Sequence, residues 1–148
     1  MTTPKVDVPN ALVPCHGVCT GGQPTRESLE EARQKGFRTI VNLRPEGEFT
    51  DFDQAAVVRE LGMEYIVIPV AGARDLNAEN ARRLHEILSD PDRCPALVHC
   101  GSGNRVGALF ALRACLHEGC TPDESLQRGR EAGLTGLEPT VHEILQQH

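Results

Sequence analysis

Residues 98–107 combine a cysteine, glycines and an arginine in a spacing that suits attack on an anion. The apolar residues before Cys100 are typical of a strand, and glycines lead from it into an expected helix that contains Arg105. Free N–H groups and the dipole at the start of such a helix stabilise negative charge, so they favour a thiolate and an anionic substrate. Arg105 adds a planar fork of donors for the same anion. The sequence therefore predicts a catalytic thiolate on Cys100 beside its anion site.

The predicted anion-binding loop follows the cysteine directly. Its glycines allow the backbone to fold into a concave nest of N–H donors. A buried structural cysteine is the alternative interpretation, but two glycines and an arginine after a strand are poor choices for packing alone. The nucleotide-binding patterns G-x-x-x-x-G-K-[ST] and G-x-G-x-x-G are missing from the sequence, so a nucleotide-phosphate loop has little support. The loop is expected to consist of Gly101, Ser102, Gly103, Asn104 and Arg105.

Two more residues are expected to support this site. His99 precedes the cysteine and either shapes the loop and favours the thiolate or only bonds nearby backbone. Arg44 follows a predicted strand, at the edge where parallel sheets place their ligands. It either steers anions or is simply an exposed arginine. A neighbouring acidic stretch is interpreted as a solvated loop rather than as paired acid and base groups: Glu46, Glu48, Asp51 and Asp53.

The composition excludes several classes of protein. The 148 residues carry a net charge of −6 and only one tyrosine and four phenylalanines, which argues against a nucleic-acid-binding surface. No apolar stretch reaches membrane-spanning length, and the first residues lack a signal-peptide pattern, so a cytoplasmic protein is expected. The six cysteines are then expected to be free thiols. Residues 15–19 contain Cys-His-Gly-Val-Cys without a second ligand pair, so neither metal nor cofactor is expected.

Short β-like runs alternate with amphipathic segments, which is typical of a parallel α/β sheet. Residues 1–12 are expected as an extended tail and residues 13–148 as a single domain. Asn77 suits a helix N-cap, and Thr121 combines a capping box with a proline at the first helical position. We predict strands at residues 18–20, 37–43, 64–68 and 95–99. We also predict six helices: one at 25–35, one that ends near 61, one that begins at 78, one from about 104 to 118, one that begins at 122 and one at 139–146.

Several segments together resemble a bacterial family, first described as a domain of unknown function and later as the phosphatase-like domain of beta-lactamase-hydrolase-like proteins. The resemblance covers nearly the whole predicted domain, with the matching segments in the same order. It implies a protein-tyrosine-phosphatase-like α/β fold with a small, mostly parallel four-stranded sheet flanked by helices. Members of the family carry phosphatase descriptions in some cases and sulfurtransferase descriptions in others. The matching segments are residues 20–25, 41–45, 65–70 and 99–107.

The chain departs from the phosphatase signature of that superfamily in three ways. Four residues separate Cys100 from Arg105 where the signature has five, which matches the spacing of rhodanese-type sulfurtransferase loops. Val106 stands where a serine or threonine would assist the leaving thiolate. A phosphatase also needs a general acid on a loop. Asp75 is the only carboxylate in the corresponding residues 69–75, and it lies later in the chain than the acid of that superfamily would be expected. Helix-start chemistry beside Asn77 is the alternative role of Asp75. All three departures favour sulfur transfer.

The leading hypothesis is therefore a sulfurtransferase on a phosphatase-like scaffold. The Cys100 thiolate would take sulfur from thiosulfate or a persulfide and pass it to a small thiol. The first alternative is a phosphomonoester phosphatase with a thiophosphoryl intermediate on Cys100 and Asp75 as the acid. The second is a non-catalytic anion-binding or redox-sensing module, in which Cys100 oxidises. Whether Cys15 or Cys19 reaches Cys100 as a resolving thiol stays open, as does the oligomeric state.

Overall fold

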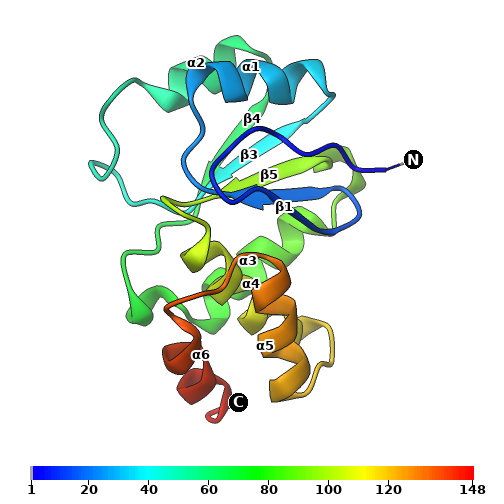
Figure 1. Cartoon of the computed structure of the whole chain (residues 1–148), viewed down its shortest axis with the longest axis vertical. Helices are drawn as coiled ribbons and strands as arrows, with labels where there is room; N and C mark the ends of the chain where they lie inside the picture. The colour runs from blue at the N-terminus through cyan, green and yellow to red at the C-terminus, as the bar shows by residue number, and fades with distance from the viewer. Residues whose placement is uncertain (1) are drawn as a thin grey trace.

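A five-stranded sheet in the order β1-β2-β5-β3-β4 forms the centre of the computed structural model, which describes residues 2–148 (Figure 1). β5 lies between β2 and β3 and pairs with both in parallel, and β3 also pairs with β4 in parallel. The predicted mostly parallel sheet is therefore confirmed. The strands are β1 (Leu12–Cys15), β2 (Val18–Gly21), β3 (Thr39–Asn42), β4 (Glu64–Val67) and β5 (Ala96–His99).

The strand β1 is the difference from the predicted four-stranded sheet. It forms an antiparallel hairpin with β2, and Gly17 turns the chain between them at a φ of 81°. Pro14 is tolerated because β1 is an edge strand, where one side needs no ladder hydrogen bond. The segment before β1, expected as an extended tail, packs Val6 and Val8 into the core at 0% and 7% exposure.

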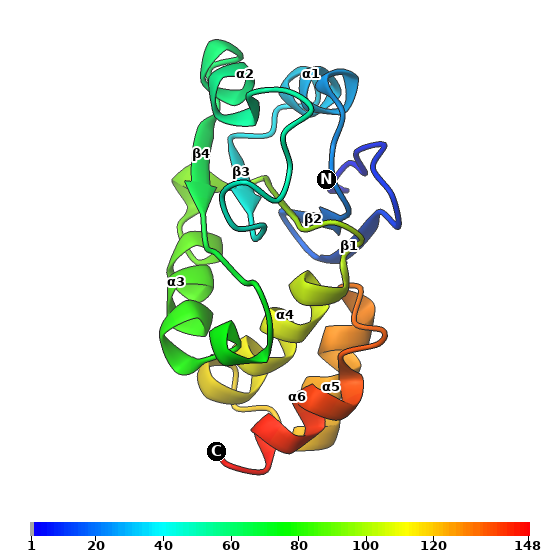
Figure 2. The same ribbon diagram turned by 90° about the vertical axis from the view of Figure 1, so that its left-hand side faces the viewer.

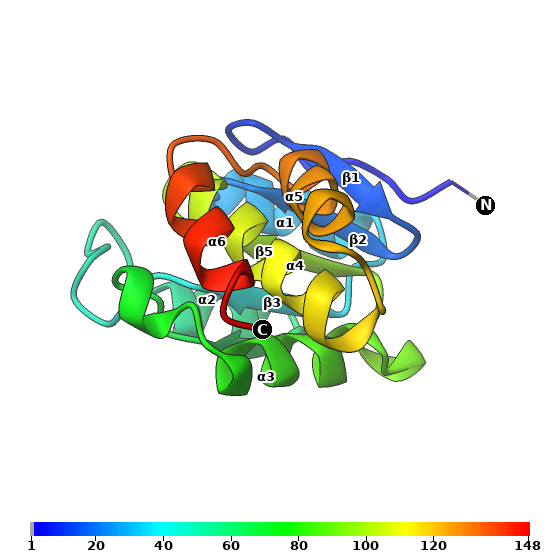
Figure 3. The ribbon, with the colours of Figure 1, turned by 90° about the horizontal axis from the view of Figure 1, so that it is seen from below.

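Helices cover both faces of the sheet, as the view from the side and the view from below show (Figures 2 and 3). Side chains alternate between the faces along each strand, so Leu97 of β5 joins one buried cluster and Val98 the other. The first face is covered by α1 (Arg26–Gln34) and α2 (Gln54–Glu60). The second face is covered by α3 (Ala78–Leu88), α4 (Asn104–His117), α5 (Pro122–Glu131) and α6 (Glu138–Leu145).

Local capping signals explain where several helices begin. The Asn77 side chain accepts from the backbone N–H of Asn80 and starts α3. Thr121 and Glu124 form the predicted capping box at the start of α5, with Pro122 as its first residue. These helix starts are confirmed as predicted. No helix within residues 2–148 is long and apolar enough to cross a membrane.

The topology places a switch point at the carboxyl end of β5. The connection from β2 to β3 passes through α1 on one face, whereas that from β4 to β5 passes through α3 on the other face. β5 itself leads into α4 on the second face, whereas its neighbours β2 and β3 lead into α1 and α2 on the first face. The chain therefore leaves the carboxyl ends of these neighbouring strands in opposite directions. Open parallel sheets bind ligands at such a switch point. The residues after β5 lie there, beside the ends of β2 and β3.

Candidate active site

Cys100 lies between the end of β5 and the start of α4. Its side chain is buried, at 1% exposure, and its Sγ accepts a hydrogen bond from the backbone N–H of Gly103 at 3.0 Å. Gly103 has a φ of 104°, in the left-handed region that favours glycine. Asn104 is the first residue of α4, so the N-terminus of this 14-residue helix adjoins the cysteine. A backbone N–H group and a helix N-terminus, which are the surroundings that the sequence predicts for this sulfur, thus lie beside it.

The loop is fixed by contacts with distant parts of the chain. The side chain of Asn104 accepts from the backbone N–H groups of Thr135 and Leu137, which ties the loop before α6 to the start of α4. Its amide therefore serves the scaffold, and only its backbone belongs to the predicted anion-binding loop. On the other side, the carbonyl oxygen of Ser102 accepts from Asn10 Nδ2 at 2.9 Å.

The turn after β2 packs against the same loop at very short range. A Cβ atom built on Gly22 would lie 2.5 Å from the carbonyl oxygen of Gly101. The next residue, Gln23, donates its backbone N–H to that oxygen at 3.1 Å. Glycine is required at position 22 because a side chain would displace the loop.

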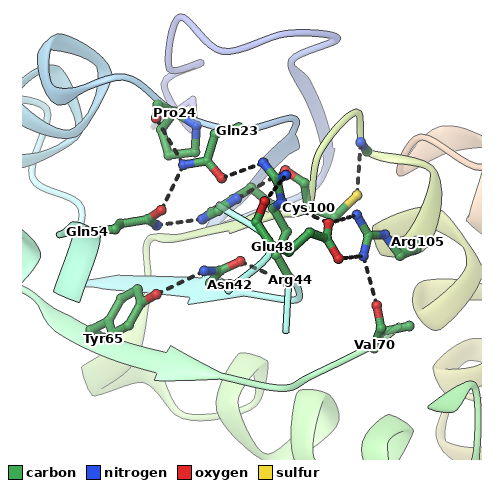
Figure 4. A network of polar contacts seen from close by, with 12 residues as sticks. Gln23, Pro24, Asn42, Arg44, Glu48, Gln54, Tyr65, Val70, Cys100 and Arg105 are labelled. Atoms are coloured by element: carbon green, nitrogen blue, oxygen red, sulfur yellow. Dashed lines mark hydrogen bonds and ion pairs between the residues drawn. The ribbon is translucent and has the colours of Figure 1, made fainter. Parts of the chain in front are cut away.

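Arg105 is held by a carboxylate from a loop 57 positions away. Its Nη1 and Nη2 both donate to the carboxylate of Glu48, and Nη1 also donates to the carbonyl oxygen of Val70 at 2.9 Å (Figure 4). The hydrogen bond from Arg105, followed by those from Arg44, lowers the pKa of Glu48 although burial opposes this. The hydrogen bond to Glu48, together with the nearby Cys100, raises the pKa of Arg105 although burial opposes this. Glu48 is exposed, as expected for the acidic stretch, but its carboxylate binds Arg105 and Arg44.

Arg44 lies at the site, but its donors are used by the protein itself. Its Nε donates to the Glu48 carboxylate at 2.9 Å, its Nη1 to Gln23 Oε1 at 3.1 Å and its Nη2 to the Glu48 carbonyl oxygen at 3.2 Å. The side chain is only 17% exposed. Arg44 therefore supports the site through Glu48 and Gln23 rather than as an exposed cation.

His99 is fully buried, and its ring bonds in two directions. Nδ1 lies 3.2 Å from the carbonyl oxygen of Cys100, and Nε2 lies 2.7 Å from Gln54 Nε2. Burial lowers its pKa to about 4, against the backbone hydrogen bond to Cys100, which raises it. His99 is therefore neutral at pH 7 and affects the loop through hydrogen bonds, not through a charge. The sequence left two roles open for His99, shaping the loop and bonding nearby backbone. Its hydrogen bond with the Cys100 carbonyl oxygen serves both.

Asp75 ends a short 3₁₀ turn, Ala73–Asp75, in the segment after β4. One oxygen of its carboxylate accepts from the backbone N–H of Ala71 at 2.9 Å. The same segment contains Val70, whose carbonyl oxygen contacts Arg105. The structure thus connects this segment to the site and commits one Asp75 oxygen to the local turn. Its role as a general acid stays a prediction.

The other cysteines considered as partners lie elsewhere. Cys19 belongs to the cluster on the α1–α2 face of the sheet, whereas Cys100 belongs to the cluster on the opposite face. Cys15 neighbours Arg113 and Glu118 at the far end of α4, about 15–20 Å along that helix from its start. Neither thiol is placed to resolve an oxidised Cys100. No group of three or more metal-ligating side chains occurs in the described part of the chain.

Glu48, Gln23 and Gln54 are the residues at this site that the sequence reasoning missed. All three act through contacts with residues far away in the sequence. One signal was available for Glu48. A partly buried arginine needs a counter-charge, and the acidic stretch after β3 leaves the same edge of the sheet.

Comparison with known proteins finds relatives over most of the chain. Residues 14–138 match the sequence profile of a family described as a DSP-PTPase phosphatase fused to NAD+ kinase. A beta-lactamase hydrolase-like protein of Xylella fastidiosa is 32% identical over 118 residues. These residues are 76% of this chain and 27% of that protein, so the chain spans about a quarter of this relative's length.

Solved structures agree on the fold. The core catalytic domain of the PP-IP phosphatase SIW14 from S. cerevisiae, in complex with citrate, superposes with a TM-score of 0.68 at 18% identity, covering 97% of this chain and 88% of that one. The active form of Tk-PTP gives a TM-score of 0.73 at 21% identity, covering 95% and 98%. The expected protein-tyrosine-phosphatase-like fold and the resemblance are confirmed. Sulfur transfer is not confirmed, and the comparisons favour the phosphatase alternative.

Proposed function

The chain belongs to the family described as a DSP-PTPase phosphatase fused to NAD+ kinase, and from this premise we propose that it is a cysteine-dependent phosphatase of small phosphate monoesters. The observation that carries the proposal is the hydrogen bond from Gly103 N–H to Cys100 Sγ, with the Arg105 guanidinium beside it. Backbone donors and a guanidinium beside a cysteine sulfur favour the thiolate, which is the nucleophile that the reaction needs.

In the first step the Cys100 thiolate attacks the phosphorus atom. A bond between sulfur and phosphorus forms, and the bond from phosphorus to the oxygen of the leaving alcohol breaks. The loop N–H groups and Arg105 bind the non-bridging oxygens, whose charge they stabilise. Glu48 and Val70 hold Arg105 in the orientation that this requires. The product of the step is a thiophosphoryl enzyme.

In the second step water releases the phosphate. Water attacks phosphorus, the bond to sulfur breaks, and Cys100 leaves as a thiolate. Asp75 is the candidate proton carrier: its carboxyl group gives a proton to the leaving alcohol in the first step and takes one from water in the second. The contact of Arg105 with Val70 supports this assignment, because it joins the Asp75 segment to the site.

Sulfur transfer remains the second candidate because one observation favours it. Only four residues separate Cys100 from Arg105, which is the spacing of a rhodanese-type loop. In that reaction the thiolate takes the outer sulfur of thiosulfate and sulfite leaves. The thiolate of a small thiol then attacks the outer sulfur of the persulfide and becomes a persulfide itself, and Cys100 leaves as a thiolate. Sulfite leaves without a proton, so this chemistry does not need Asp75.

Hydrolysis of an aryl phosphate by the wild type, Cys100→Ser and Cys120→Ser tests the proposal. Cys120→Ser is the matched control, since it makes the same change outside the site. We expect Cys100→Ser to lose activity about a thousandfold or more, and Cys120→Ser to retain it. A one-sulfur adduct on Cys100 after incubation with thiosulfate, without phosphate hydrolysis, would favour sulfur transfer instead. Oxidation by peroxide without either reaction would favour a redox sensor.

The role of Asp75 is tested with leaving groups of different basicity. Asp75→Asn should lower kcat for an alkyl phosphate by about 100-fold. It should lower kcat for a nitrophenyl phosphate much less, because nitrophenolate leaves without a proton. Equal losses for both substrates would contradict a general-acid role and indicate that Asp75 only shapes the turn with Ala71.

A further inference from the structure

A line of four hydrogen bonds connects Arg44 with the backbone of the anion-binding loop (Figure 4). Arg44 Nη1 donates to Gln23 Oε1 at 3.1 Å, and Gln23 Nε2 donates to Gln54 Oε1 at 2.7 Å. Gln54 Nε2 lies 2.7 Å from His99 Nε2, and His99 Nδ1 lies 3.2 Å from the carbonyl oxygen of Cys100. We call these residues the relay.

Both ends of the relay determine its direction. Arg44 has only donors, so the Gln23 oxygen must face it, and each amide then donates to the next residue. This leaves His99 Nε2 as an acceptor, with the proton on Nδ1. At the other end, the Cys100 carbonyl oxygen can only accept, which also requires the proton on Nδ1. The two ends therefore demand the same tautomer of a neutral ring, and burial keeps His99 neutral.

The tautomer of His99 matters because the carbonyl oxygens of the loop accept hydrogen bonds from donors outside the loop. The oxygens of Cys100, Gly101 and Ser102 accept from His99, from the Gln23 backbone and from Asn10, respectively. In a planar trans peptide the C=O and the following N–H point in opposite directions. Holding these oxygens outward directs the N–H groups of residues 101–103 into the loop, as the Gly103 N–H bond to Cys100 Sγ illustrates.

We propose that Gln54 is a positioning residue of the anion site, which it serves through His99. Gln54 is 5% exposed and begins α2, on the opposite face of the sheet from α4. It donates to His99 Nε2, keeps the proton on Nδ1, and so holds the peptide between Cys100 and Gly101 in the orientation that aims the Gly101 N–H at a bound oxyanion. This role deepens the proposed phosphatase function and rests on it for the identity of the anion.

Gln54→Met removes the amide at nearly constant length and leaves an apolar group against His99. Without a donor at Nε2, the ring no longer has a fixed tautomer, and the Nε2-protonated form releases the Cys100 carbonyl oxygen. Val58→Ala is the matched control. Val58 is fully buried in the same helix and takes no part in the relay, so its truncation lowers stability only.

Two measurements test the role without a substrate. Long-range ¹H–¹⁵N spectra of the imidazole rings at pH 7, assigned with His99→Asn, report which nitrogen carries the proton. We expect Nδ1 in the wild type and in Val58→Ala, and a mixture of tautomers in Gln54→Met. Titration calorimetry with tungstate, a tetrahedral oxyanion, should give about tenfold weaker binding to Gln54→Met and unchanged binding to Val58→Ala.

The outcomes separate the positioning role from the proposed function. A proton on His99 Nε2 in the wild type overturns the role even if Gln54→Met does not fold. Tungstate affinity of folded Gln54→Met within twofold of the wild type also overturns it. If both measurements agree with expectation while the wild type hydrolyses no aryl phosphate, the phosphatase function fails and the positioning role stands.

Discussion

His99 should make the stability of this protein fall between pH 6.5 and pH 4. Its pKa in the folded state is about 4, against an ordinary value of 6.5, chiefly because burial penalises the charged ring. As the pH falls below 6.5 the unfolded chain binds a proton at this residue and the folded protein does not. The stabilisation is therefore complete above pH 6.5 and is lost as the pH falls towards 4.

The magnitude follows from the difference of about 2.5 between the two pKa values. One pKa unit corresponds to about 1.4 kcal/mol, so the full loss is about 3 kcal/mol below pH 4. At pH 5 the loss from His99 is about 2 kcal/mol. This is a large share of the stability of a domain of this size, which is about 5–15 kcal/mol.

Urea denaturation of the wild type and of His99→Asn at pH 7.5 and pH 5 measures this loss. Asparagine does not titrate, and groups common to both proteins cancel, including His85, whose pKa is also lowered by burial and by Arg113 and His117. We expect the stability advantage of the wild type over the variant to shrink by about 2 kcal/mol on going to pH 5. An unchanged difference would refute the reasoning, because His99 would then titrate as an exposed histidine.

Two further substitutions test the geometry of the site. Glu48→Gln removes the charged partner of Arg105 and should lower kcat for an aryl phosphate by about tenfold. Glu46→Gln makes the same change of charge at an exposed residue and should leave kcat unchanged. Equal effects of the two substitutions would show that only the net charge matters. Gly22→Ala places a Cβ 2.5 Å from a carbonyl oxygen of the anion-binding loop, so we expect about 1–3 kcal/mol lower stability and weaker tungstate binding. Gly136→Ala, whose new Cβ makes only ordinary contacts, should show neither effect in the same two assays.

Elements with local signals could be predicted from the sequence. The cap at Asn77 and the capping box at Thr121 act within one helical turn, so the sequence alone contains them. The strand β1 could not be predicted in this way. It has four residues including Pro14, and none of them is buried, so no core-facing pattern marks it as a strand. It is a strand because β2 lies beside it.

The candidate site likewise contains residues with local signals and residues that depend on distant contacts. The strand, the cysteine, the glycines and Arg105 follow one another in the chain, so their proximity could be predicted. Glu48 contacts Arg105 across 57 positions and Gln54 contacts His99 across 45. These pairs depend on how the loop after β3 folds back over the sheet edge, which no local pattern specifies. An acidic residue in that loop is therefore equally compatible, in sequence, with solvation alone and with an ion pair to the arginine of the site.

The spacing between Cys100 and Arg105 does not decide between the two reactions. The four-residue spacing matches a rhodanese-type loop, but outward bonding of three carbonyl groups still directs three N–H groups inward. A phosphoryl group and the sulfonate end of thiosulfate each have three terminal oxygens, so this nest suits both. The reactions differ in the leaving group, because an alkoxide needs a proton and sulfite does not. The choice between them therefore depends on whether Asp75 supplies a proton, and not on the number of residues in the loop.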